Sequence, residues 1–204
     1  ILQMSDSTKE NLLLIFVKNP QKGQVKTRLA ASIGDDRALN VYKKLLGITK
    51  SVTDQLNCIR QVWYSQFIED QDRWSERGYK KKLQTGGDLG QRMSNAFQAG
   101  FEDRYQKVVI IGSDCAELRA EILHQAFIAL NDVDTVLGPS QDGGYYLLGM
   151  NSLYSELFKN KPWSTSTVLD DTLRHIKKKN LSYRLLPTLN DIDTQKDLKN
   201  TTEI

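Results

Sequence analysis

Long hydrophobic runs are missing from this chain of 204 residues. The longest uninterrupted apolar segment, Leu12–Val17, has six residues, whereas a helix that crosses a membrane needs roughly 20. Residues 1–11 lack the basic, apolar and small-residue sections of a signal peptide. We therefore expect no membrane span and no export signal, as in a cytoplasmic protein.

Cysteine is scarce as well. The chain has two cysteines, Cys58 and Cys115, which form no spaced cluster. A lone pair in a chain of this length favours reduced thiols over a secreted scaffold held by disulfides. A domain of this size buries roughly 70% of the surface of its unfolded chain, so its core needs no disulfide or structural metal.

The excess of positive charge is small, with 28 Lys and Arg against 25 Asp and Glu and a net charge of +3. Nucleic-acid-binding proteins concentrate far more basic charge on one face. We therefore expect no nucleic-acid partner, although mild basicity suits an anionic substrate.

No low-complexity or Pro/Gly/Ser-rich stretch divides the chain, which favours one domain at 12–204 after a flexible N-terminal extension at 1–11. Short apolar runs alternate with longer amphipathic stretches, as is typical of α/β proteins with a mainly parallel sheet. The apolar runs predict strands at Leu12–Val17, Gln61–Tyr64, Lys81–Gln84, Lys107–Ile111, Thr135–Leu137, Tyr145–Gly149 and Tyr183–Leu186. The amphipathic stretches predict helices at Asp35–Gln55, Leu89–Phe101, Leu118–Leu130, Ser166–Lys178 and Thr194–Lys199.

A basic loop follows the first predicted strand, at the edge of the sheet where open α/β folds bind ligands. Residues 18–29, Lys-Asn-Pro-Gln-Lys-Gly-Gln-Val-Lys-Thr-Arg-Leu, hold four cations and one glycine before a helix. The loop suits a polyphosphate because Gly23 permits close backbone approach, while Lys26 and Arg28 supply charge and fork-shaped donors. Its spacing is not that of a Walker A loop, and a solvated surface loop is the alternative.

A glycine-rich segment follows the third predicted strand. Residues 84–93, Gln-Thr-Gly-Gly-Asp-Leu-Gly-Gln-Arg-Met, contain three glycines in a stretch of five residues. Such a turn can bring backbone amides and carbonyls against a flat base. A tight strand-to-helix turn capped by Asp88 explains the segment equally well.

Carboxylates follow other predicted strands. Asp114 stands at the tip of a predicted central strand and is the first candidate for a metal ligand, since one or two carboxylates commonly hold Mg²⁺ together with substrate phosphates. Helix capping is the alternative. Asp142 precedes a glycine pair and an aromatic, which fits a sugar site or a hairpin turn. Asp191 and Asp193 precede the last helix, where capping explains one carboxylate more naturally than both.

One aromatic and several hydroxyls meet in the segment 161–167, Lys-Pro-Trp-Ser-Thr-Ser-Thr, before a predicted helix. Sugar-like acceptors present apolar faces to an aromatic and hydroxyls to polar partners, so we expect this segment to border an acceptor pocket. Alternatively, Trp163 fills the core while Ser164 or Ser166 caps the helix.

These segments, in this order, resemble the small GT-A-fold transferases called radical-SAM/selenodomain-associated transferase 1, also described as arsenosugar-biosynthesis glycosyltransferases. The likeness spans about Leu12 to Leu198. Its most specific parts are Lys18-Asn19-Pro20 through Lys26-Thr27-Arg28-Leu29, Asp88-Leu89-Gly90, Gly112-Ser113-Asp114-Cys115, Asp142-Gly143-Gly144-Tyr145-Tyr146 and Pro162-Trp163-Ser164-Thr165. More distantly, the chain resembles the molybdenum-cofactor and 2-phospholactate guanylyltransferases.

The resemblance implies a single-domain α/β GT-A fold of the nucleotide-diphosphosugar transferase superfamily, with a Rossmann-like, mixed, mainly parallel sheet and helices on both faces. It implies that Asp114 and Asp193 bind Mg²⁺ or Mn²⁺. Asp193 is favoured over Asp191 because the segment 191–194 resembles the Asn-Ile-Asn-Thr motif of those relatives. The implied nucleotide-binding residues are Lys18, Gly23, Lys26, Arg28, Gln84, Gly86, Leu89 and Gly90. The expected substrate-binding residues are Asp142, Gly143, Gly144, Tyr145, Trp163, Ser164 and Thr165.

The expected function is glycosyl transfer from a nucleoside diphosphate sugar to a small-molecule acceptor. Lys26 and Arg28 would add catalytic charge at the phosphates, beside a metal bridging diphosphate and carboxylate. Asp142 would be the acceptor-side base or a ligand of sugar hydroxyls. The alternative is a nucleotidyltransferase of the guanylyl or cytidylyl type, in which an acceptor attacks a nucleoside triphosphate and pyrophosphate leaves. A third hypothesis is a catalytically silent nucleotide-binding protein, because a shared fold alone does not secure activity.

Overall fold

The computed structural model describes residues 10–75, 78–202 and 204. Most of the expected N-terminal extension, namely residues 1–9, lies outside the described residues, and Asn11 already opens the first strand. Within the described ranges, no helix combines the length and the apolar character that crossing a membrane requires.

Strands and helices alternate along the chain, as the hydrophobic pattern predicts. The strands are β1 (Asn11–Val17), β2 (Ile59–Tyr64), β3 (Tyr79–Leu83), β4 (Lys107–Ile111), β5 (Thr135–Pro139), β6 (Tyr145–Met150) and β7 (Tyr183–Leu185). The helices are α1 (Thr27–Ile33), α2 (Asp35–Thr53), α3 (Leu89–Glu102), α4 (Ala120–Ala129), the 3-10 helix η1 (Ser155–Phe158), α5 (Val168–Lys178) and α6 (Gln195–Asn200). Every predicted strand and helix is confirmed, and no boundary moves by more than two residues.

Two short helices, α1 and η1, go beyond the sequence-based expectation. The basic loop is shorter than its sequence suggests, because α1 begins at Thr27. Lys26 precedes this helix in a left-handed backbone conformation (φ 51°) and makes no side-chain capping bond. A seven-residue helix without a capping side chain carries none of the usual start signals in its sequence.

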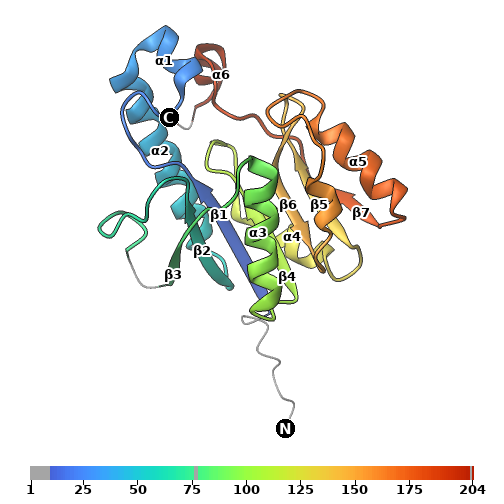
Figure 1. The fold of residues 1–204 in the computed structure, drawn as a ribbon. Helices are drawn as coiled ribbons and strands as arrows, with labels where there is room; N and C mark the ends of the chain where they lie inside the picture. Colours follow the sequence, from blue (N-terminus) through green and yellow to red (C-terminus); the bar gives the residue numbers. More distant parts are fainter. Residues whose placement is uncertain (1–9, 76–77, 203) are drawn as a thin grey trace.

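The strands form one seven-stranded sheet in the order β3-β2-β1-β4-β6-β5-β7 (Figure 1). All neighbouring strands are parallel except β6, which runs antiparallel to both β4 and β5. A tight turn returns the chain directly from β5 to β6, whereas the parallel neighbours need crossover connections. The expected mixed, mainly parallel sheet is therefore confirmed.

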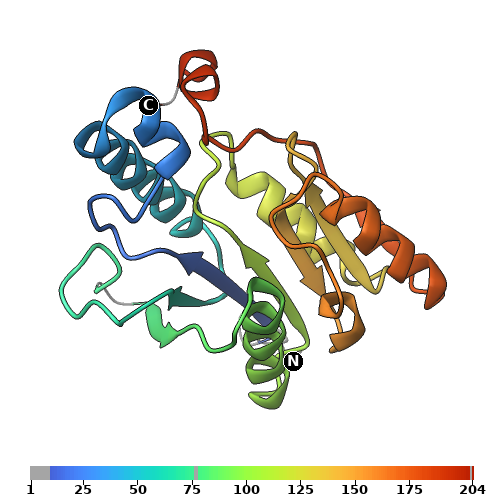
Figure 2. The same ribbon diagram turned by 45° about the horizontal axis from the view of Figure 1, so that its top comes forward.

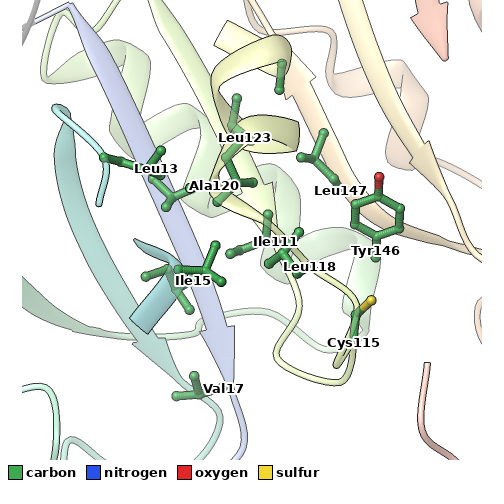
Figure 3. Close-up of a cluster of buried hydrophobic side chains, with 14 of the residues drawn as sticks. Leu13, Ile15, Val17, Ile111, Cys115, Leu118, Ala120, Leu123, Tyr146 and Leu147 are labelled. Atoms are coloured by element: carbon green, nitrogen blue, oxygen red, sulfur yellow. The ribbon is translucent and has the colours of Figure 1, made fainter. Parts of the chain in front are cut away.

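Helices cover both faces of the sheet. Alternate residues of each strand point to opposite sides, so one strand packs against helices on both faces. Leu13 and Ile15 of β1 pack with residues of α2 and α4 in one buried cluster, part of which Figure 3 shows. Leu12 and Leu14 pack with residues of α3, α5 and η1 in a second cluster. The central strands thus read as continuous apolar runs because they are buried on both faces.

A smaller apolar cluster joins α1 and α2 to the C-terminal part of the chain. Leu29 of α1 and Ala38 of α2 pack with Ile192, and Leu198 of α6 packs against them. Figures 1 and 2 show α6 beside α1, although almost the whole sequence separates them. This packing holds the segment before α6 next to the loop after β1.

Candidate functional site

A pocket with a volume of about 880 Å³ opens at the carboxyl ends of the parallel strands. Its lining includes Lys18 after β1, Ser65 after β2, Gln84 after β3 and Gly112 after β4, as expected for an open α/β sheet. The predicted site residues that line it are Lys18, Lys26, Arg28, Gln84, Leu89, Asp114, Asp142, Gly144, Tyr145, Trp163, Ser164, Thr165 and Asp193. The chain folding therefore brings most of the predicted residues together.

Four glycines expected to contact ligands lie outside the pocket lining, namely Gly23, Gly86, Gly90 and Gly143. Contacts within the protein account for their positions. Gly23 and Gly86 have positive φ angles of 74° and 134°, which suit turns. A Cβ atom on Gly90 would lie 2.5 Å from the ring of Trp163, and one on Gly143 would lie 2.0 Å from the carbonyl oxygen of Ser166. Glycine at these two positions lets neighbouring segments approach closely.

Buried polar side chains hold the loop after β1 in place. The Lys18 amide donates to the hydroxyl of Tyr42 at 2.8 Å, and that hydroxyl also lies 3.1 Å from Ser113 Oγ. Asn19 is buried, and its side chain bonds to the backbone of Gln66 and Phe67. Tyr42 thus ties the basic loop to the residue next to Asp114. The sequence pattern marks Tyr42 only as an apolar helix position, because its hydrogen-bond partners Lys18 and Ser113 lie far from it along the chain.

Lys26 lies between the two predicted metal ligands. Its Nζ is 2.6 Å from Asp114 Oδ1 and 3.0 Å from Asp193 Oδ1. The lysine side chain is 3% exposed, while those of Asp114 and Asp193 are 43% and 41% exposed. Burial alone would lower the pKa of Lys26, but the two carboxylates outweigh it and raise that pKa. Lys26 therefore carries a buried positive charge in this arrangement.

Helix capping does not explain these carboxylates. The helix after Asp114 begins at Ala120, and Arg119 occupies its N-cap. Thr194 caps α6 in a reciprocal capping box with Asp197, so neither carboxylate before Thr194 is the N-cap. Asp114 and Asp193 therefore cap no helix, and both line the pocket in contact with Lys26.

Asp191, the residue that the sequence resemblance set aside, also lines the pocket. Its segment pairs with the loop after β4, because Cys115 and Asp191 form an antiparallel bridge and the Ile192 amide donates to the Asp114 carbonyl at 3.0 Å. Burial, together with the carboxylate of Asp114, raises the pKa of Asp191 to about 7, although the cation of Lys26 opposes this rise. Together with Asp88, the cap of α3, Asp191 is one of two acidic residues that line the pocket beyond those expected.

The glycine-rich segment is a strand-to-helix turn. Asp88 caps α3 by accepting a bond of 2.8 Å from the Gln91 amide, as the structural alternative predicts. The Gln84 side chain donates to the Trp63 carbonyl at 2.8 Å, which fixes it at the pocket wall. Arg92, which the sequence did not single out, also lines the pocket and donates to the Gly86 carbonyl at 3.2 Å.

Asp142 stands in the hairpin turn between β5 and β6. Its Oδ1 accepts bonds from the Ser140 hydroxyl and from the Gly144 amide, the latter at 2.9 Å. Ser140 lines the pocket beside it and was not expected there. The turn and the pocket are thus compatible, because one carboxylate oxygen shapes the turn and Oδ2 makes no bond in the described part of the protein.

Trp163 belongs both to the pocket and to the core, the two interpretations that its segment allowed. Its ring lines the pocket, packs on Gly90 of α3 and contacts the second core cluster. The neighbouring residues Ser164 and Thr165 are exposed at the pocket wall. Neither Ser164 nor Ser166 caps α5, whose N-cap residue is Thr167.

Asp114 and Asp193 are the side chains of this pocket that could hold a divalent cation. Their oxygens converge on one positive group, Lys26 Nζ, and both side chains are partly open. Over the ranges 10–75, 78–202 and 204, no group of three or more His, Cys, Asp or Glu side chains is arranged to hold a metal. Such a pair suits an ion whose remaining ligands are substrate phosphates and water.

The chain is similar to several solved structures. A candidate nucleotide-diphospho-sugar transferase of Desulfovibrio desulfuricans G20 is 32% identical, with 95% of this chain and 90% of that chain covered and a TM-score of 0.87. The 4-diphosphocytidyl-2C-methyl-D-erythritol synthase of Anaerococcus prevotii DSM 20548 is 10% identical, with coverages of 95% and 94% and a TM-score of 0.61. The inositol-1-phosphate CTP transferase of T. maritima is 12% identical, with coverages of 95% and 93% and a TM-score of 0.56.

The two distant similarities show the fold alone, which is that of nucleotide-diphospho-sugar transferases and nucleotidyltransferases. No curated protein sequence matches the chain. Residues 48–165 match the family described as "Uncharacterized protein conserved in bacteria (DUF2064)". The chain therefore belongs to this family, within the superfamily of nucleotide-diphospho-sugar transferases.

Proposed function

We propose that the protein is a metal-dependent glycosyltransferase that moves a sugar from a nucleoside diphosphate sugar to a small-molecule acceptor. The observation that carries this proposal is the meeting of Asp114, Asp193 and Lys26 in one pocket at the carboxyl ends of the strands. The similarity to the Desulfovibrio protein over nearly the whole chain supports a transferase of this class.

On the donor side, Asp114 and Asp193 bind Mg²⁺ or Mn²⁺, which supplies positive charge that offsets the charge of the departing nucleoside diphosphate. Lys26 and Arg28 bind the phosphates and favour bond cleavage, because negative charge grows on the leaving phosphate as the bond breaks. Gln84, Gly87 and Leu89 line the side of the pocket that receives the base.

On the acceptor side, Asp142 offers its Oδ2 to an acceptor hydroxyl, because Oδ1 is engaged within the turn. That oxygen binds the hydroxyl or accepts its proton during transfer. Trp163 contacts an apolar face of the acceptor, while Ser164 and Thr165 bind its polar groups. Tyr145 completes this wall of the pocket.

We further assign the protein to the radical-SAM/selenodomain-associated transferase 1 group, whose motifs it resembles, and thus to arsenosugar-type glycosyl transfer. Cys58 and Cys115 are both free, which suits a reducing compartment, and we propose a cytoplasmic location.

Nucleotidyl transfer is the second candidate function. The fold is shared with two cytidylyl-transferring enzymes, the Anaerococcus and T. maritima proteins. In this reaction a phosphorylated acceptor attacks the α-phosphate of a nucleoside triphosphate. Lys26 and Arg28 then bind the pyrophosphate that leaves.

A donor screen with and without Mn²⁺ separates these functions. Metal-dependent release of a nucleoside diphosphate from sugar donors supports glycosyl transfer. Release of pyrophosphate from nucleoside triphosphates and phosphorylated acceptors overturns it in favour of nucleotidyl transfer. Binding of nucleotides without turnover in either assay indicates a catalytically silent protein.

A further inference from the structure

The position of Lys26 between the two carboxylates has a consequence for the order of ligand binding. Both contacting oxygens, Asp114 Oδ1 and Asp193 Oδ1, already pair with its ammonium group. A divalent ion entering alone has to compete with a positive group that is permanently attached to the protein. If Lys26 stayed in place, the ion would also be repelled by it across a partly desolvated site.

We propose that Lys26 keeps divalent metal ions out of the carboxylate pair until a nucleoside diphosphate arrives. The diphosphate offers the Lys26 ammonium a second anionic partner within the same pocket, which Lys26 lines. When Lys26 moves to the phosphates, the carboxylates become free for the metal. The inference rests on the proposed function, because it takes Asp114 and Asp193 as the metal ligands.

The surroundings of Lys26 support such an exchange of partners. The lysine stem is buried, but both carboxylates are more than two-fifths exposed, so a ligand in the pocket reaches them without unfolding the loop. The Lys26 carbonyl accepts the first bond of α1 from the Ala30 amide at 2.8 Å. The backbone of Lys26 is therefore held in place, and the side chain moves by rotation about its own dihedral angles.

Thermodynamic linkage makes the coupling reciprocal. If the nucleoside diphosphate strengthens metal binding by releasing the carboxylates, the metal strengthens diphosphate binding by the same factor. The bare protein then binds divalent ions weakly, and metal and nucleotide occupy the site together.

The test measures free Mn²⁺ by its EPR signal in titrations of the wild type, Lys26→Met and Lys22→Met. Lys22 is the matched control because it lies in the same loop but pairs with Asp36 at the surface. Without nucleotide, we expect Lys26→Met to bind Mn²⁺ at least about fivefold more tightly than the wild type, the lower end of ordinary coupling between ligands. Lys22→Met should equal the wild type. Equal or weaker binding by Lys26→Met overturns the inference.

Folding of each variant is checked by circular dichroism, and Lys26→Gln serves as a second variant that keeps two hydrogen-bond donors without the charge. The wild type is also titrated with Mn²⁺ in the presence of ADP, GDP, CDP or UDP. If none of these nucleotides raises the affinity of the wild type for Mn²⁺ by at least about fivefold, this result alone contradicts the proposed coupling.

The outcomes separate this inference from the proposed function. If neither the bare wild type nor the wild type with any nucleoside diphosphate binds Mn²⁺, the metal-dependent function fails and the inference falls with it. If Mn²⁺ binds with nucleotide and Asp114→Asn abolishes that binding, the metal site stands. If Lys26→Met and Lys26→Gln then bind Mn²⁺ no more tightly than the wild type, only the proposed role of Lys26 is excluded.

Discussion

At the scale of single residues, Tyr42 joins the two loops that carry the charged side chains. Its hydroxyl contacts the Lys18 backbone and Ser113 Oγ, and burial raises its pKa above the usual range, so the hydroxyl stays neutral. A neutral hydroxyl can both donate and accept. The site therefore depends on a side chain of α2 that provides no charge of its own.

The carboxylate of Asp114 is the first residue to test. We expect Asp114→Asn to lower metal-dependent turnover at least about tenfold, since even groups that only support metal ligands cost that much when changed. The melting temperature should change little, because the amide keeps the shape and Asp193 still pairs with Lys26. Asp103→Asn, at the exposed C-cap of α3, is the control and should retain full turnover. Unchanged turnover in Asp114→Asn would remove this residue from the site.

Arg28 is expected to recognise phosphate, not the nucleoside. Arg28→Ala should weaken nucleoside diphosphate binding by at least about tenfold, because hydrogen bonds to charged groups contribute roughly 1.5–3 kcal/mol. Binding of the free nucleoside should fall much less. Isothermal titration calorimetry compares both ligands, with Arg37→Ala as the control, since Arg37 is exposed on α2 and lies outside this pocket. Equal losses for both ligands would contradict the phosphate assignment.

At the scale of elements, the segment 162–167 links α3 to the hairpin between β5 and β6. Trp163 packs on Gly90 in the first turn of α3, and Ser166 packs on Gly143 in the hairpin. The Leu169 amide of α5 also donates to the Gly143 carbonyl at 2.9 Å. This one segment therefore connects the part of the pocket at α3 with the part at the hairpin.

A double-mutant cycle tests the contact between α3 and this segment. Gly90→Ala should cost about 1–3 kcal/mol of stability, because the added methyl group collides with the Trp163 ring and forces the packing to shift. In a Trp163→Ala background the same change should be neutral or stabilising, since alanine favours helix over glycine by roughly 1 kcal/mol.

Urea unfolding of the four proteins gives the coupling energy, which should exceed about 1 kcal/mol for residues in contact. The same cost in both backgrounds would show that Trp163 does not restrict Gly90. Trp163→Ala itself should reduce both stability and acceptor-dependent turnover, because the ring belongs to core and pocket.

At the scale of the whole molecule, β1 is an interior strand of the sheet, with helices on both faces. Ile15 on this strand is 0% exposed, whereas Ile128 on α4 is 61% exposed. We expect Ile15→Ala to lower the free energy of unfolding by about 2–5 kcal/mol and Ile128→Ala to change it by less than about 0.5 kcal/mol.

Two probes of urea unfolding, tryptophan fluorescence and far-ultraviolet circular dichroism, test whether the chain unfolds as one unit. Coincident transitions are expected for a single domain. Separate transitions would mean that the chain does not unfold as one unit. Equal losses of unfolding free energy in the two isoleucine variants would mean that Ile15 does not lie in the core.

The sequence by itself determined the elements of this fold. Buried parallel strands such as β1 are continuous apolar runs, and helices such as α3 repeat apolar residues at helical spacing. Because ligands of open α/β sheets bind after the strands, the order of the segments along the chain was enough to assign Asp114 and the basic loop to one site. The short helix α1 escaped prediction because it lacks a capping side chain and begins after a left-handed residue.

Only the tertiary structure decided which charged groups meet. Lys26 and Asp193 are separated by 167 positions in the sequence, and local periodicity carries no information over that distance. The packing of α6 against α1 brings them together. The sequence predicted Lys26 at the phosphates, while the fold pairs it with the two carboxylates, because a buried cation needs opposite charge within hydrogen-bond distance.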